Sequence, residues 1–298
     1  MRTRHPHPSW PQVSKVPASY FAISSYLDPI GDRRAVRRGG STNRHIVYPW
    51  RVSGKQLQPR VISARRGLLR ALRGGASVGG MTDKPTPQAV DAFLDSTIVG
   101  DDPALSAALE ASNAAGLPPI AVSAQQGKFL SLLAGAIRAR RILEIGTLGG
   151  FSTIWLARGA GPQGRVVTLE YEPKHAEVAR ANVDHAGVGD RVEVLVGAAL
   201  DTLPTVTGGP FDLIFIDADK ENNAAYLQWA VKLSHSGSVI VVDNVIRDGK
   251  IIAESGDARV TATRKTLELM GQHPDLDTAV LQTVGAKGWD GFALATVK

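Results

Sequence analysis

The sequence predicts a doubly wound α/β fold whose sheet is mostly parallel, and three observations support this prediction. Short apolar runs recur at regular intervals, helical stretches lie between them, and two further strand-like segments end the chain. A run that is apolar at every position is typical of a strand covered by helices on both faces. Strands that alternate with helices favour parallel pairing within one sheet.

Three helices open this pattern. Residues 83–99 and 103–115 are predicted as two short helices that end at Gly100 and Gly116, since glycine commonly terminates a helix. The third helix begins after Ser123, a residue type that is preferred as a helix N-cap. An apolar stripe along this third helix predicts that one of its faces is buried.

Five apolar runs of four or five residues predict the parallel strands, at residues 142–145, 166–169, 192–196, 213–216 and 239–242. Helices are predicted between and after them, at residues 151–158, 174–185, 222–233 and 258–272. The last two strands are predicted at residues 278–283 and 291–297. They form a hairpin that closes one edge of a seven-stranded sheet.

Charge divides the chain into two parts. Residues 1–80 hold 15 Lys and Arg against 2 Asp, a net charge of +13, whereas residues 81–298 hold 19 against 26 acidic residues, a net charge of −7. The pI of about 9.6 for the whole chain would suggest a nucleic-acid partner only if the folded part carried the positive charge. We expect residues 1–80 to be a disordered, basic leader and residues 81–298 to be the folded domain.

Three interpretations of the leader compete. In the first it is a nucleic-acid-binding arm, in the second an organelle transit peptide, and in the third a stretch upstream of a true start at Met81. Composition, order and charge all change at Met81, so the third interpretation is favoured.

Several classes of protein are excluded by composition. The chain has no Cys, so it has no disulfide, thiolate zinc site, iron–sulfur cluster or cysteine nucleophile. No apolar run approaches the roughly 20 residues of a membrane helix, which predicts a soluble, cytoplasmic protein. The seven His residues are scattered, which disfavours a His-ligated metal and a Ser-His-Asp triad.

Small and acidic residues follow the first three strands, where ligands bind in such folds. The glycine-rich turn Gly146-Thr147-Leu148-Gly149-Gly150 lets the backbone approach a ligand, although Leu148 breaks the G-x-G-x-x-G pattern and an ordinary turn is the alternative. Glu170 would bind the two hydroxyls of a ribose, unless it is simply solvated. Ala198 and Ala199 leave room for a flat ring, or form a plain turn. Together these positions favour an adenosine-containing ligand.

Oxygen-bearing side chains follow the fourth and fifth strands. Asp217 ends the fourth strand, and Asp243 and Asn244 end the fifth. If the two strands are neighbours, these three donors meet and fit a hard cation such as Mg²⁺, the alternative being that they cap the next segments. Lys220 would lie beside the cation, where partial burial favours the neutral amine that a general base needs; a surface lysine is the alternative.

These segments, LEIGTLGGFSTIWLA, TLEYEP, VGAAL, FDLIFIDADKENN and VIVVDNV, occur in an order and spacing that resembles one family. It is the cation-dependent O-methyltransferases of the caffeoyl-CoA and catechol O-methyltransferase type, in their bacterial branch. The resemblance covers residues 81–298 and includes Ser123-Ala124-Gln125-Gln126-Gly127. It implies the Rossmann-like, seven-stranded fold of the class I methyltransferases that use S-adenosylmethionine.

The resemblance also implies the role of each site residue. S-adenosylmethionine would be held by Val122, Glu144, Gly146, Thr147, Ser152, Glu170, Ala199, Asp217 and Asp219. Glu170 would bind its ribose, and Ala199 would lie by its adenine. The divalent cation, Mg²⁺ by expectation, would be held by Asp217, Asp243 and Asn244, with Lys220 and Asp217 as the catalytic residues.

The acceptor implied by this family is a catechol-type phenolic small molecule, and the implied assembly is a homodimer. Asp248 stands where plant caffeoyl-CoA enzymes carry a substrate-contacting Asn, which argues against a CoA ester. Arg247 and Lys250 would meet an anionic substrate or lie in solvent. Two other functions compete: an RNA methyltransferase that uses the basic leader, and a nucleotide-binding module or nicotinamide dehydrogenase. Leu148 departs from the G-x-G-x-x-G pattern, which disfavours the nucleotide-binding module and the nicotinamide dehydrogenase.

Overall fold

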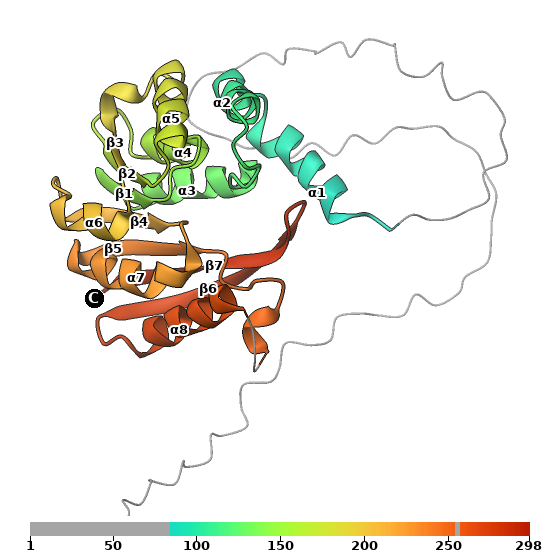
Figure 1. The fold of residues 1–298 in the computed structure, drawn as a ribbon. Helices are drawn as coiled ribbons and strands as arrows, with labels where there is room; N and C mark the ends of the chain where they lie inside the picture. Colours follow the sequence, from blue (N-terminus) through green and yellow to red (C-terminus); the bar gives the residue numbers. More distant parts are fainter. Residues whose placement is uncertain (1–83, 254–256) are drawn as a thin grey trace, which may run out of the picture. The chain divides into compact units, whose positions relative to one another are not determined.

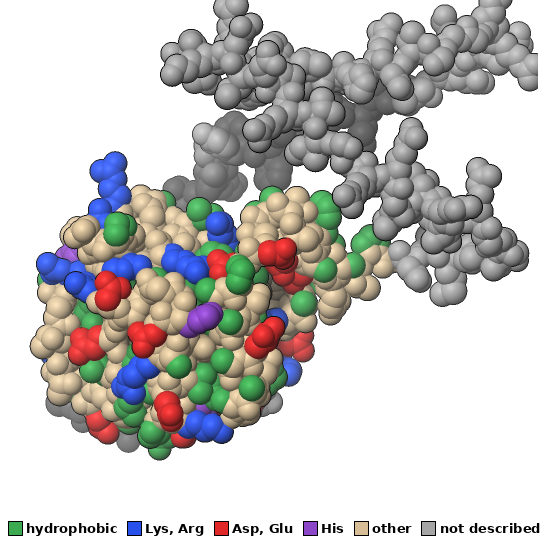
Figure 2. Space-filling view, turned by 90° about the horizontal axis from the view of Figure 1, so that it is seen from above, with side chains coloured by type: hydrophobic (Ala, Val, Ile, Leu, Met, Phe, Trp, Pro, Cys, Tyr) green, Lys and Arg blue, Asp and Glu red, His purple; other side chains and the backbone are tan. Residues whose placement is uncertain are grey.

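The computed structural model describes residues 84–253 and 257–298 (Figure 1). The predictions for residues 1–80, including a disordered leader and a start at Met81, lie outside the described residues. Within the described ranges no helix is long and apolar enough to cross a membrane. On the face displayed in Figure 2, Lys and Arg side chains are interspersed with Asp and Glu rather than gathered in one basic patch.

One seven-stranded sheet forms the centre of the domain, in the order β3-β2-β1-β4-β5-β7-β6. Its strands are β1 Arg141–Ile145, β2 Arg165–Glu170, β3 Val192–Val196, β4 Phe211–Ile216, β5 Ser234–Asp243, β6 Leu276–Gly285 and β7 Gly288–Val297. The first five strands pair in parallel, whereas β7 runs antiparallel to both β5 and β6. The predicted fold class is therefore confirmed, including the antiparallel hairpin at the edge.

The helices mostly match the predicted ranges. They are α1 Pro87–Leu94, α2 Pro103–Ala114, α3 Ala124–Ala136, α4 Phe151–Gly159, α5 Pro173–His185, α6 Ala199–Thr202, α7 Asn223–Lys232 and α8 Ala258–Gln272. Ser123 caps α3 as predicted, its hydroxyl accepting from the Gln126 amide. The first predicted helix is divided, because α1 ends at Leu94 and a π-helical turn, Asp95–Val99, follows. The short α6 was not predicted.

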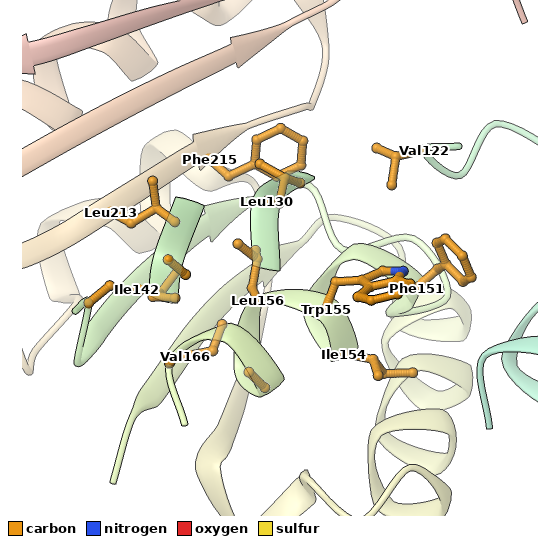
Figure 3. Close-up of a cluster of buried hydrophobic side chains, with 14 of the residues drawn as sticks. Val122, Leu130, Ile142, Phe151, Ile154, Trp155, Leu156, Val166, Leu213 and Phe215 are labelled. Atoms are coloured by element: carbon orange, nitrogen blue, oxygen red, sulfur yellow. The ribbon is translucent and has the colours of Figure 1, made fainter. Parts of the chain in front are cut away.

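Helices cover both faces of the sheet, which makes the fold doubly wound (Figure 1). Alternate residues of each strand point to opposite faces. Ile142 and Phe215 pack with α3 and α4 on one face (Figure 3), while Leu143 and Ile214 pack with α7 and α8 on the other. Because both faces are buried, the central strands β1, β2, β4 and β5 are mostly apolar along their buried length, with buried polar exceptions such as Glu144 and Thr168.

Candidate active site

A cavity of about 1250 Å³ lies at the carboxyl edge of the parallel strands. It is lined by most of the predicted site residues, namely Val122, Gly146, Thr147, Ser152, Glu170, Ala199, Asp217, Asp219, Lys220 and Asn244. Two of the predicted residues, Glu144 and Asp243, are buried and do not line it. The strand ends thus bring residues that are far apart in sequence to one cavity, as expected for this fold class.

The glycine turn after β1 is pressed against the end of β4. Gly146 has a φ of +100°, and a Cβ placed on it would lie 2.1 Å from the carbonyl oxygen of Asp217. Only glycine fits such a close approach in that backbone conformation. The Asp217 amide donates to the Ile145 carbonyl at 2.9 Å, so the turn and Asp217 are fixed relative to each other.

Glu144 forms a buried cluster beneath this turn. Its carboxylate accepts hydrogen bonds from the hydroxyls of Ser152 at 2.6 Å, Thr168 at 2.7 Å, and Thr153. Burial raises the pKa of Glu144 to about 7, and the three hydroxyl donors oppose that rise. Glu144 therefore anchors Ser152 at the cavity wall, while a direct contact with a ligand remains a prediction.

Glu170 ties the end of β2 to the glycine turn. Its Oε2 accepts from the amides of Thr147 at 3.1 Å and Leu148 at 2.7 Å, and its Oε1 accepts from the Glu172 amide at 3.0 Å. His175 Nδ1 lies 3.3 Å from Glu170 Oε1. His175 was not predicted as a site residue, and its position in the first turn of α5, shortly after β2, was the available signal.

Asp217 and Asp243 lie at the ends of neighbouring parallel strands. Ile216 of β4 is in register with Val242 of β5, so the next residue on each strand reaches the same edge. Asp243 is 5% exposed. Burial, followed by the negative charge of Asp217, raises the pKa of Asp243 to about 7. The two carboxylates are thus held close together, and the site disfavours the ionised form of Asp243.

Asn244 adds an amide to this pair. Its φ of +58° is a left-handed conformation, which Asn adopts more readily than most residues. No cluster of three His, Cys, Asp or Glu residues suited to a metal occurs among the residues described. The candidate metal centre therefore consists of two carboxylates and one amide, a hard oxygen donor set that suits Mg²⁺ better than a softer metal.

Lys220 and Asp219 project from the turn after β4. Lys220 Nζ donates to Asp217 Oδ1 at 2.9 Å and is buried. Asp219 accepts from Asn222 Nδ2 at 2.6 Å and from the Tyr226 hydroxyl. Burial, and then Asp219, raise the pKa of Tyr226 well above its usual range. Tyr226 was not predicted, although its spacing of seven residues from Asp219 is two helical turns.

A second cavity of about 580 Å³ lies at the opposite edge, where the parallel strands begin. Its arginines are already engaged by backbone carbonyls: Arg141 by Gly209 at 3.2 Å, and Arg191 by Ala157 and Gly161 at 2.7 Å. These contacts give the arginines a structural role. The cavity at the carboxyl edge is the candidate active site.

Comparison with known proteins places this site in a family. Residues 96–295 match the family model described as O-methyltransferase. A catechol O-methyltransferase of Mycobacterium tuberculosis is 75% identical over 219 residues, covering 74% of this chain and 100% of that protein. A catechol O-methyltransferase of Niastella koreensis is 48% identical over 215 residues, covering 71% of this chain and 97% of that protein.

Solved structures agree with this result. The crystal structure of an O-methyltransferase from Bacillus cereus in complex with SAH has a TM-score of 0.69 and 52% sequence identity, covering 71% of this chain and 98% of that one. The matched region spans nearly the whole length of the Bacillus cereus protein, as it does for the two relatives. The predicted fold, family and enzyme class are confirmed: the chain belongs to the O-methyltransferase family.

Proposed function

We propose that this protein is an S-adenosylmethionine-dependent O-methyltransferase that requires a divalent cation, Mg²⁺ by preference, and methylates a vicinal dihydroxy aromatic. One observation carries the proposal: Asp217 and Asn244 line the cavity at adjacent strand ends, with Lys220 beside Asp217, and the buried carboxylate of Asp243 interacts with Asp217 from behind the wall. The relatives named catechol O-methyltransferase support the acceptor class. The structure containing SAH, the product of methyl donation, supports the donor.

The donor end of the cavity comprises the turn 146–152, Glu170, Ala199 and Asp219. Backbone amides of the turn and Ser152 would hold the methionine part of the donor, with Glu144 supporting Ser152 from below. Glu170 has used three of its lone pairs on backbone amides and would offer the remainder to ribose hydroxyls. Val122 would contribute through its backbone.

The acceptor end comprises Asp217, Lys220, Asp243 and Asn244. The raised pKa of Asp243 is the observation that fits a cation here, because a cation would offset the repulsion between the two carboxylates. When bound, the cation would bind both oxygens of a vicinal diol and lower the pKa of the attacking hydroxyl.

Lys220 would then move the proton. Its Nζ lies 2.9 Å from Asp217 Oδ1, next to the place where the acceptor hydroxyl would lie. In its neutral form it would take the hydroxyl proton as the oxygen attacks the methyl group of the donor. The close contact of Gly146 with Asp217 fixes the two ends relative to each other, so much of the rate would come from orientation.

Methylation of 3,4-dihydroxybenzoate by S-adenosylmethionine tests the proposal. Activity should disappear with EDTA and return with Mg²⁺, and activity that is indifferent to EDTA would overturn the metal requirement. The assay should compare the full chain with a protein that begins at Met81. Equal activity favours a small-molecule acceptor, whereas loss of activity on truncation favours the RNA methyltransferase alternative. A homodimer and a cytoplasmic location remain predictions.

A further inference from the structure

The tip of the β6–β7 hairpin reaches the same cavity from a distant part of the chain. Ala286 and Lys287 form the turn of this hairpin and line the cavity. The Ala286 amide donates to Asp91 Oδ2 of α1 at 2.6 Å, which holds the tip in place. Burial lowers the pKa of Lys287, and the negative charges of Asp217 and Asp243 oppose that shift, so Lys287 lies within electrostatic reach of the acceptor end.

Arg247 reaches the cavity from the loop after β5. Asp290 Oδ1 fixes this loop by accepting from the amides of Ile246 at 3.0 Å and Arg247 at 3.1 Å. The Nε of Arg247 is buried and has no hydrogen-bond partner in the described structure. A buried donor that lacks an acceptor is costly, so this guanidinium is suited to a ligand that supplies one.

Arg259, in the first turn of α8, is a third cation on the cavity wall. Across residues 84–253 and 257–298, none of Arg247, Arg259 and Lys287 has a carboxylate within the 4.0 Å of an ion pair. Asp257 is near both arginines, but its side chain caps α8 by accepting from the Val260 amide at 2.9 Å. Lys250, by contrast, is exposed and does not line the cavity.

We propose that Arg247 and Lys287, with Arg259 at the rim, select an acceptor that carries a carboxylate in addition to its vicinal hydroxyls. The inference rests on the proposed function. The diol would be held at Asp217, Asp243 and Asn244, and the carboxylate would meet the cations that line the same cavity. Charge-assisted hydrogen bonds from Arg or Lys to a carboxylate are among the stronger polar contacts in proteins.

Two acceptors of the same shape and different charge test this inference: 3,4-dihydroxybenzoate and 3,4-dihydroxybenzamide. The ratio of their kcat/KM values should favour the benzoate, and the double variant Arg247→Gln/Lys287→Gln should lower that ratio about tenfold or more. The control is Lys250→Gln. Lys250 is a cation three residues from Arg247 that does not line the cavity, so its substitution should leave the ratio unchanged. A ratio that is the same in the wild type and the double variant would overturn the inference.

A second measurement needs no variant. Raising the ionic strength to about 0.5 M screens exposed charges, so it should raise KM for the benzoate of the wild-type protein more than KM for the benzamide. Equal salt dependence for the two acceptors would count against the inference. Methylation of neither compound would instead overturn the proposed function, so the two failures are distinguishable.

Discussion

At the donor end of the cavity the carboxylates are satisfied by the protein itself, whereas at the acceptor end charged groups are left short of partners. Glu170 accepts three backbone amides, and Glu144 accepts three hydroxyls. Asp243 also accepts from the Asn244 amide, at 2.8 Å, but it is buried next to the carboxylate of Asp217, and Arg247 Nε has no acceptor among the described residues. The donor end is thus preorganised, and the acceptor end is completed by what binds there.

The largest expected effect on turnover comes from a substitution at the acceptor end. Asp243→Asn preserves shape but removes a negative charge from the proposed cation site, so we expect kcat to fall by about 10³-fold. Binding of SAH, measured by calorimetry, should stay within a few-fold of wild type because the donor end is separately held together. Asp277→Asn, at an exposed position on β6, is the matched control. Equal loss of SAH binding and turnover would show that the two ends are not separable.

Lys220→Gln should have the next largest effect. It removes the proposed proton acceptor beside Asp217, and general-base catalysis typically contributes about 10²-fold or more. The kcat of this variant should fall accordingly while its Mg²⁺ affinity is retained. Lys265→Gln, on the exposed side of α8, should behave as wild type. A Lys220→Gln enzyme with wild-type turnover would remove Lys220 from the mechanism.

The pH dependence of stability sharpens the comparison. Asp243 and Glu144 have pKa values raised from 3.8 and 4.5 to about 7, so the native state binds more protons than the unfolded chain between these values. The stability that these groups contribute is therefore full below about pH 4 and is lost as the pH rises to about 7.

Urea denaturation at pH 5 and pH 8, with and without Mg²⁺, measures this effect. Mg²⁺ should stabilise the protein at pH 8 and much less at pH 5, because protons compete for Asp243 at the lower pH. Asp243→Asn should flatten the fall between the two pH values and abolish the effect of Mg²⁺. Stabilisation by Mg²⁺ that is equal at both pH values would contradict the assignment of Asp243 as a ligand.

The smallest effect tests the donor end. Tyr226→Phe removes one of the two hydrogen bonds that hold Asp219, and the loss of such a bond costs about 1 kcal/mol. We expect the affinity for S-adenosylmethionine to fall about fivefold with little change in kcat. An unchanged affinity would mean that Asn222 alone positions Asp219.

Much of the site was predictable because parallel strands end at one edge of the sheet. Runs that are apolar on both faces located the strands, and the first polar residue after each run, such as Glu170, Asp217 or Asp243, then had to lie at that edge. The fold followed from the same pattern, except for short features such as the π-helical turn after α1.

The residues that escaped prediction reach the site through tertiary packing. Lys287 arrives on a hairpin whose tip is fixed by α1, and nothing in its local sequence reports that contact. Tyr226 and His175 point into the cavity because α7 and α5 pack against particular strands. Local sequence also could not separate residues that line the cavity from Glu144, which supports one of them from the interior.

The contact between Gly146 and the Asp217 carbonyl has a consequence for engineering. Any larger residue at 146 would displace the strand end that carries Asp217, so a change made there to admit a bulkier alkyl donor would also shift the acceptor end. Donor range and acceptor range cannot be altered independently at this position. Redesign for longer transferred groups is better begun at Ile120 or Leu200, which line the cavity without that contact.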